Sequence, residues 1–437
     1  MSDLLPDAES LVSTALAKGA DQAEVFLSQG ASIDVDVESG RLAGSSRSQN
    51  RGGSVRVVRD HRLGFAYFTR LEQAPSAIDR ALAQARLSPE LPLDLPSPEP
   101  LQAIGDHWDE SLAELDPAIA LDAARDIIQG VDVDATISGG IGISWGEEAL
   151  ANSHGVACAD RATMMQGYTS LVLEGETTVN AWETTSNHGI IDAHAMSLRL
   201  SETVTSLANP APADDGPADI ILRPDAGSEL IVGLMEGSLD GDPAMRGKSF
   251  WSNKLGEPVA HKGLQLRDAP HMKGALGSTP FDGEGRATRD APLVLDGHLA
   301  TYLFDTRDAA KHGQDPTRHA TREGFKSPPG TGTHHVVLEH ANTQSLEQLI
   351  QDVDHGYLVD SVLGAHTANG TTGDFSVTAP NVWRIRDGAL DGACKEIALG
   401  GNLPKLLMHL DGVSDDPKAS LGSRIPAMRL RNVHVST

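Results

Sequence analysis

Two proline-rich stretches divide the chain and limit how it can fold. Residues 88–100 and 210–217 are both dense in proline. Proline lacks a backbone N–H and fixes φ, so neither stretch is suited to a helix interior or a central strand. The stretches predict three units: an N-terminal α+β domain over residues 1–90, a central α+β domain over 101–208 and a β-rich C-terminal domain over 218–437. A chain of 437 residues is long enough for several such units.

The first two units read as helices beside short antiparallel strands. Helical spacing of apolar residues predicts helices near 11–16, 78–85, 112–131 and 193–207. Strand runs at 23–27 and 33–37 are separated by Gln29-Gly30, which predicts a turn. Residues 33–37 alternate apolar and acidic side chains, as in a half-buried strand. The N-terminal unit is therefore expected to be a helix-plus-meander layer, with a second α+β layer after it.

The pattern changes after residue 218. Short β-branched runs, frequent glycine and many turn pairs dominate, and only 225–237 and 346–352 show helical spacing. This sequence pattern is typical of a barrel or sandwich of short strands. The fold class expected for the whole chain is α+β with a β-rich, barrel-like C-terminal domain.

Charge and cysteine content exclude several classes of function. The chain has 35 Lys+Arg against 61 Asp+Glu, a formal net charge of −26. This charge repels phosphate backbones and anionic lipid, so we expect neither nucleic-acid nor membrane-surface binding. Cys158 and Cys394 are the two cysteines, too few for a disulfide framework. No secretion signal or long apolar run is recognisable, so a cytoplasmic location is expected.

The histidine-rich segment 333–340 is the first place to look for a metal. Zinc-peptidase helices carry two histidines on one face beside a glutamate. Here Val336-Val337 favours a strand, on which His334 and His340 face opposite to His335. Polar strand ends are the preferred interpretation.

The segment 363–376 is the most informative polar stretch. It packs Gly, Thr, Asn and Asp between two apolar runs. It is either a hairpin with a long polar turn or a loop that presents donors and hydroxyls to a substrate cavity. The cavity candidates are His366, Thr367, Asn369, Gly370, Thr371, Thr372, Asp374 and Ser376.

Several stretches together resemble the TldD/TldE family, whose TldE member is also called PmbA and is labelled a modulator of DNA gyrase. The matching residues are Ala23-Glu24-Val25, Arg56-Val57, residues 63–66, 237–242, 369–376 and 401–403, and Ile425-Pro426. They follow the family's three-unit order over essentially the whole chain. The most specific of them is the Gly-Thr-Thr-Gly-Asp-Phe-Ser run at 370–376.

The resemblance implies that this chain is the metal-free TldE subunit. TldD subunits carry a His-Glu-x-x-x-His zinc motif shortly before a segment like Leu239-Asp240-Gly241-Asp242. Counting back places the three motif positions on Val232, Gly233 and Gly237, none of which can bind zinc or act as a base. Histidines five residues apart would also require a widened helical turn. The further cysteine ligand of TldD has no counterpart in 418–421, Lys-Ala-Ser-Leu.

The expected function follows from that resemblance. A TldE-like subunit would hold no cofactor itself and would pair with a zinc-bearing TldD-like subunit to form a peptidase for unfolded or short peptides. The partner would supply the zinc, and this chain a cavity wall. A homodimer is also open, as is a stand-alone homo-oligomeric protein that binds peptides or a protein partner without hydrolysis. A third reading is a self-sufficient hydrolase with an unrecognised site.

Overall fold

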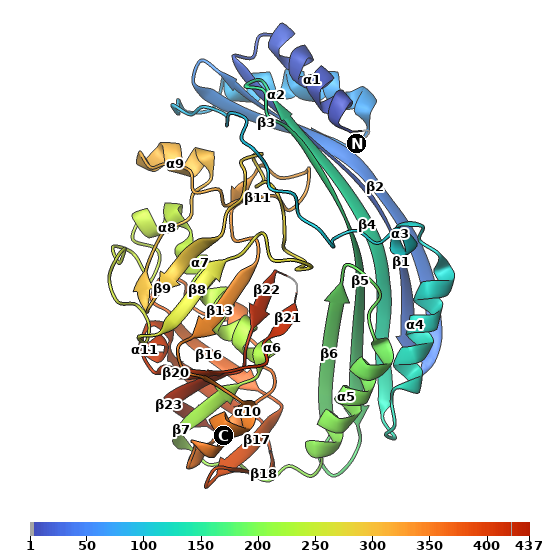
Figure 1. Ribbon diagram of the computed structural model, residues 1–437, viewed down its shortest axis with the longest axis vertical. Helices are drawn as coiled ribbons and strands as arrows, with labels where there is room; N and C mark the ends of the chain where they lie inside the picture. The colour runs from blue at the N-terminus through green and yellow to red at the C-terminus, as the bar shows by residue number, and fades with distance from the viewer. Residues whose placement is uncertain (1–3, 421) are drawn as a thin grey trace.

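A long six-stranded antiparallel sheet curves around the rest of the molecule (Figure 1). The computed structural model describes residues 4–420 and 422–437. The strand order is β3-β2-β1-β4-β5-β6. The strands are β1 (Gln22–Glu38), β2 (Arg41–Arg59), β3 (Arg62–Phe68), β4 (Thr136–Asn152), β5 (Ala157–Leu173) and β6 (Val179–Asn187).

The turn predicted at Gln29-Gly30 is wrong, because β1 runs straight through it. Gln29 pairs with Arg51 on β2 and with Glu147 on β4, and Gly30 continues both ladders. A Cβ on Gly30 would lie 2.7 Å from the backbone oxygen of Trp145. The glycine therefore serves a close approach between neighbouring strands, the other common reason for glycine inside a strand.

The first two predicted units share this one sheet. β1 pairs with β4 from Glu24 to Glu38, so the ladder crosses the boundary that the proline-rich stretch marks in sequence. That stretch is tied to the sheet: the Leu95 N–H donates to the Gln22 side chain at 2.8 Å, and the Asn152 amide donates to the Pro96 carbonyl at 2.8 Å. It connects two halves of a single layer.

Helices cover the convex face of the sheet. Odd-numbered residues of β1 from Ala23 to Val37 face them and are buried, apart from the part-buried Gln29. The helix predicted over 112–131 is split, because Pro117 begins a new helix whose N-cap, Asp116, accepts a hydrogen bond from the Ala118 N–H at 2.9 Å. The elements of this layer are α1 (Leu5–Ala17), η1 (Leu71–Gln73), α2 (Ala74–Ala85), α3 (Glu110–Ala113), α4 (Pro117–Gln129) and α5 (Ala193–Ser206).

The C-terminal domain is built from two larger mixed sheets and a short ladder. One sheet has the order β10-β9-β8-β13-β22-β21, and the other runs β14-β20-β23-β7-β15-β17-β18 with β16 and β19 attached. Their strands are β7 (Gly216–Leu222), β8 (Leu264–Asp268), β9 (Ala291–Leu295), β10 (His298–Leu299), β13 (Val336–His340), β14 (Thr343–Gln344), β15 (His355–Val359), β16 (Asp374–Ala379), β17 (Val382–Arg386), β18 (Ala389–Cys394), β19 (Ile397–Asn402), β20 (Leu410–Ser414), β21 (Lys418–Ser420), β22 (Ser423–Ile425) and β23 (Met428–Ser436). The short ladder joins β11 (Ala320–Thr321) to β12 (Gly330–Thr331).

This arrangement agrees with the α+β class and the β-rich C-terminal domain expected from sequence. Helical segments in this domain are more numerous than the two predicted. They are α6 (Pro224–Gly227), the π-helical turn η2 (Ser228–Val232), α7 (Gly233–Leu239), α8 (Gly241–Met245), α9 (Thr306–His312), α10 (Leu346–Gln351), η3 (Ala365–Thr367) and α11 (Leu403–Leu407).

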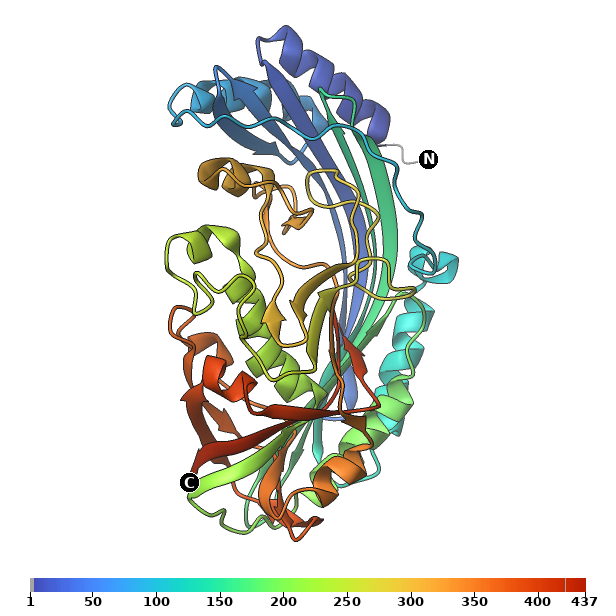
Figure 2. The ribbon, with the colours of Figure 1, turned by 60° about the vertical axis from the view of Figure 1, so that its left-hand side comes forward.

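The C-terminal domain lies on the concave side of the curved sheet (Figure 2). Near one end, Phe26 and Leu150 of the sheet pack with Phe281 and Phe325 of the domain. At the other end, the Trp383 indole donates to the Ser206 hydroxyl of α5 at 3.1 Å. Within the part of the chain that the structure describes, no helix has the length and apolar character needed to cross a membrane.

Candidate functional site

The three predicted motif positions lie on one continuous helical segment formed by α6, η2 and α7. The segment begins at Pro224 and ends at Leu239, where the backbone of Asp240 leaves helical geometry. A π-helical turn is present, but it ends at Val232, the first of the motif positions. The rest of the interval, from Gly233 to Gly237, is ordinary α-helix, in which residues five apart point ~140° away from each other.

Burial confirms that these positions diverge. Val232 is 1% exposed and packs in the C-terminal core. Gly233 and Gly237 are exposed, with open space where a side chain would project: a Cβ on Gly233 would come no closer than 3.7 Å to the Ser228 oxygen, and one on Gly237 would meet nothing within 4 Å. The three positions therefore present one aliphatic side chain inward and bare backbone outward.

Glu236 is the carboxylate that this helix directs toward the neighbouring polar residues. The Thr333 hydroxyl donates to it. Burial raises the pKa of the Glu236 carboxyl, and the nearby Asp268 acts in the same direction, while the Thr333 hydrogen bond opposes them. The helix is thereby joined to the histidine-rich segment.

The histidines of that segment are organised around the buried carboxylate of Asp268. Its oxygens accept hydrogen bonds from the backbone N–H groups of His334, at 3.0 Å, and His335, at 2.7 Å. His319 stacks on His334 with ring centroids 5.9 Å apart, and its Nε2 lies 3.4 Å from Asp268. Burial lowers the pKa of His319 to about 4, so this imidazole is neutral at pH 7.

These residues do not assemble into a metal site. Neither ring nitrogen of His335 has a hydrogen-bond partner among the described residues, and burial lowers the pKa of that imidazole. In the described ranges, no group of three or more His, Cys, Asp or Glu side chains could hold a metal ion. The strand predicted for 336–337 is present as β13. Lys418, Ala419 and Ser420 form β21, and Leu421 lies outside the described residues.

A cavity of about 240 Å³ lies between the concave face of the sheet and the loops of the C-terminal domain. Burial raises the pKa of Glu148 on β4 to about 7, assisted by Asp160, and that of Asp282 to about 6, assisted by Glu284. Carboxyls that exchange protons near neutral pH are suited to acid–base chemistry or to binding a cation. The lining residues are Phe26, Glu148, Leu150, Gly277, Thr279, Phe281, Asp282, Gly283, Ala320, Thr321, Arg322, Thr333 and His334.

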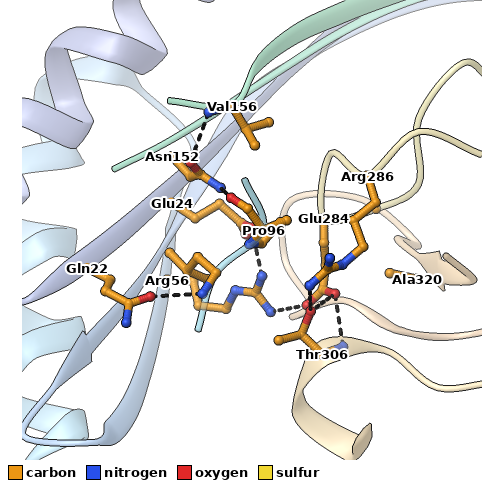
Figure 3. A network of polar contacts seen from close by, with 12 residues as sticks. Gln22, Glu24, Arg56, Pro96, Asn152, Val156, Glu284, Arg286, Thr306 and Ala320 are labelled. Carbon is orange, nitrogen blue, oxygen red and sulfur yellow. Dashed lines mark hydrogen bonds and ion pairs between the residues drawn. The ribbon is translucent and has the colours of Figure 1, made fainter. Parts of the chain in front are cut away.

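A buried ionic network beside this cavity joins the sheet to the C-terminal domain (Figure 3). Arg56 on β2 donates to Glu24 on β1 at 2.7 Å and to Glu284 at 2.5 Å. Arg322 adds a second bond to Glu24 at 2.5 Å. Glu284 also accepts hydrogen bonds from the backbone and the hydroxyl of Thr306, at 2.9 and 2.5 Å. Sequence reasoning marked Glu24 and Arg56 as parts of the family resemblance but missed Glu284, which has no motif around it.

The predicted loop 363–376 contains η3, an ordered turn and the first three residues of β16. The Asn369 side-chain oxygen accepts from the backbone of Thr371 at 2.9 Å and of Thr372 at 3.2 Å. Asp374 accepts from the Thr372 hydroxyl at 2.7 Å and from Asn402 at 2.9 Å, and these bonds lower the pKa of Asp374. Two stretches of the resemblance, 369–376 and 401–403, are therefore in direct contact.

The loop lies beside the helical segment that carries the motif positions. His366 is close enough to Glu229 on η2 to oppose the rise that burial causes in the pKa of that carboxyl. The Gly370 carbonyl accepts from the N–H of Phe250, which follows the helical segment in the chain, at 3.2 Å. All eight cavity candidates, His366, Thr367, Asn369, Gly370, Thr371, Thr372, Asp374 and Ser376, are exposed in this single chain, outside the 240 Å³ cavity. Their assignment as a cavity wall stays a prediction.

Comparison with known protein families places the chain in a class of peptidase-related proteins. The model of the PmbA/TldA metallopeptidase C-terminal domain matches residues 215–437, and that of PmbA/TldA metallopeptidase domain 1 matches residues 23–87. The chain therefore belongs to the PmbA/TldD metallopeptidase family.

Individual relatives agree over the full length. TldE from Thermococcus kodakarensis has 25% identity and a TM-score of 0.89, covering 99% of this chain and 100% of that one. A Thermotoga maritima protein whose structure is described as that of a DNA gyrase modulator has 18% identity and a TM-score of 0.90 over 99% of both chains, a likeness of fold. Metalloprotease PmbA of Escherichia coli O157:H7 is 27% identical over 93% of this chain and 91% of its own length.

Proposed function

We propose that this chain is a non-catalytic TldE/PmbA-like subunit that pairs with a zinc-bearing TldD-like subunit in a peptidase for unfolded or short peptides. The observation that carries the proposal is the motif helix: Val232, Gly233 and Gly237 offer no metal ligand or base, and they do not face a common point. Zinc in the partner would polarise the scissile carbonyl and activate water. This chain would contribute surface and access control.

The exposed surface beside the motif helix supports the presence of a partner. Gly233 and Gly237 leave a strip of backbone without side chains, and the ordered polar loop 363–376 lies next to it. A rigid loop with satisfied internal hydrogen bonds presents its remaining donors and hydroxyls without further ordering cost. A second subunit covering this face would enclose the loop and turn it into a cavity wall.

The outer edge of β2 is a second surface suited to a partner chain. β3 pairs with Gly53 to Arg59, which leaves the edge of β2 from Arg41 to Gly52 without a neighbouring strand in the described part of the chain. Residues 41–51 are all exposed and include three arginines and no carboxylate. A long unpaired edge is a template for another chain, and its positive charge suits an acidic partner surface.

Zinc content and reconstituted activity test the proposal. The purified chain, dialysed against zinc and analysed for metal, is expected to hold less than stoichiometric zinc and to leave casein and short peptides uncut. Addition of a companion that carries His-Glu-x-x-x-His is expected to yield a co-purifying complex with peptidase activity that a chelator abolishes. Stoichiometric zinc and peptide cleavage by the isolated chain would overturn the assignment.

The alternative is a stand-alone homo-oligomer that binds peptides without cleaving them. The same free edge of β2 could pair with a second copy of the chain. Light scattering of a mixture with the companion distinguishes the two functions. The homo-oligomer would form no complex with the companion, whereas the proposed subunit would form a mixed complex.

A further inference from the structure

A groove runs along the free edge of β3, far from the motif helix in sequence. β3 ends the six-stranded sheet, and beyond the bridge from Arg62 to Glu90 at its start, no described strand pairs with the outer side of its backbone. The groove encloses about 760 Å³. It is lined by residues 65–69, by Gln73, Ser76, Arg80 and Gln84 from the η1–α2 segment, and by Lys326 and Pro328 from the C-terminal domain.

Backbone geometry shows which groups face the groove. Val55 and Ala66 are partners across the β2–β3 ladder, and Phe65 donates its N–H to the Gln84 side chain at 2.9 Å, away from β2. Alternation along a strand then directs the N–H and C=O of Phe65, Tyr67 and Thr69 outward. These outward groups are the ones to which the backbone of an added strand would hydrogen-bond.

Side chains from the η1–α2 segment occupy that edge in the free chain. Arg80 donates to the Tyr67 carbonyl at 2.9 Å, and Gln73 accepts from the Thr69 N–H at 3.4 Å. Such caps protect an edge from uncontrolled pairing but are exchangeable, because exposed Arg and Gln side chains find equivalent partners in water. Tyr67 is 45% exposed, which leaves an aromatic surface beside the edge.

The charge of the groove contrasts with that of the protein. The two lining side chains that are charged at neutral pH, Arg80 and Lys326, are both cations, and neither forms an ion pair with any described residue. The chain as a whole carries −26. Long-range electrostatics therefore favour cationic ligands everywhere except at local positive sites such as this one.

We infer that this groove binds an acidic segment of an extended polypeptide, which adds as a strand to the edge of β3. Its backbone would replace the caps on Phe65, Tyr67 and Thr69, its carboxylates would pair with Arg80 and Lys326, and an apolar side chain would cover Tyr67. Within the proposed peptidase complex this site would hold an unfolded substrate away from the point of cleavage. That role rests on the proposed function, whereas the binding itself does not.

The test uses the full-length chain alone with a fluorescein-labelled, amidated hexapeptide of alternating glutamate and valine. Fluorescence anisotropy is expected to show saturable binding, stronger than for the corresponding lysine–valine peptide, although the net charge favours the latter. The double variant R80E/K326E should weaken binding of the glutamate peptide by roughly tenfold or more and strengthen that of the lysine peptide. The double reversal K254E/K395E changes the net charge by the same amount, at two exposed lysines that form no ion pair among the described residues, and should change neither binding by more than about twofold.

Backbone pairing is tested on the ligand, which avoids any folding defect in the protein. N-methylation of alternate peptide bonds removes donors on one edge of the hexapeptide. Methylation in one of the two alternating registers should abolish binding, and methylation in the other should be tolerated. Equal binding of both methylated peptides, equal binding to R80E/K326E, or no saturable binding of the glutamate peptide would each overturn the inference. None of these results would bear on zinc content or on activity with a companion.

Discussion

Arg56 makes the contact on which the junction between the sheet and the C-terminal domain most depends. It is 3% exposed and joins Glu24 to Glu284, which lies 228 residues away in the chain. Arginine suits this position because its planar guanidinium can serve two carboxylates at once and stays charged when buried. Replacing a buried pair as a whole can be neutral, but removing one member leaves an unpaired charge in the interior.

Substituting Arg56→Met should therefore destabilise the chain strongly. The expected loss is about 3–5 kcal/mol in the free energy of unfolding, since Glu24 and Glu284 keep their burial and lose a shared cation. Urea denaturation followed by circular dichroism measures it. The control is Lys18→Met, which removes the surface pair with Asp79 and should cost ~1 kcal/mol or less. Equal losses in the two variants would contradict this account of the network.

Glu148 should make stability depend on pH near neutrality. Its folded pKa of about 7 lies above the ordinary value of 4.5, so the folded state holds the proton more tightly than the unfolded state. Stability from this group is complete below about pH 4.5 and is lost as the pH rises through about 7. Glu148→Gln should then match the parent chain in acid and exceed it by roughly 1–3 kcal/mol at pH 8.

The measurement is urea denaturation of both proteins across that pH range. Thr279→Val alters the same cavity without a titrating group, so its difference from the parent should not vary with pH. A constant difference between Glu148→Gln and the parent chain would show that the Glu148 carboxyl does not hold its proton as described.

At the scale of elements, the segment 224–239 is helical although its three motif positions carry no metal ligand and no base. Apolar side chains including Leu230, Ile231, Val232 and Met235 bury it against the C-terminal core, independently of any metal. The opposite face carries glycines, which cost helix stability because glycine loses more backbone entropy than alanine. Glycines on an exposed helix face, despite their cost in helix stability, are suited to another chain that packs closely against the backbone there.

The double variant G233A/G237A should separate stability from assembly. Each alanine has room and is expected to stabilise the isolated chain by about 0.5–1 kcal/mol, because helix propensity rises and no contact is displaced. If a zinc-bearing subunit packs on this face, the added methyl groups should weaken the complex by roughly tenfold. Thermal denaturation of the chain and titration with the companion give the two values. Unchanged affinity would place the partner elsewhere.

At the scale of the whole molecule, a curved sheet with a domain on its concave side leaves one long edge uncovered. Even-numbered residues of β2 in the region of Ser46–Val58 bond toward β1, as the Asp21 N–H to Val58 carbonyl contact shows, and odd-numbered residues face outward. The outward groups of Ser45, Arg47, Gln49 and Arg51 are therefore available to a second chain.

Two neighbouring proline substitutions test this edge. Gln49→Pro removes an outward N–H and should change the stability of the chain by less than about 1 kcal/mol while blocking strand addition. Ser48→Pro removes an N–H from the β1 ladder and should cost ~3 kcal/mol or more. Light scattering with the companion is expected to show loss of the mixed complex for Gln49→Pro at unchanged fold. A complex that forms normally with Gln49→Pro would remove β2 from the interface.

The sequence by itself determined the fold class, the longer helices, the strand around Val336-Val337 and the lack of ligands at Val232, Gly233 and Gly237, because periodicity and side-chain chemistry are local properties. Tertiary structure decided the rest. Gly30 marks either a turn or a close strand approach, and only the neighbouring Trp145 backbone distinguishes them. The union of two predicted units into one sheet, the bond from Arg56 to Glu284 and the direction of each motif position all depend on contacts between residues far apart in the chain. Such contacts produce no periodic pattern in the sequence, so the sequence alone could not predict them.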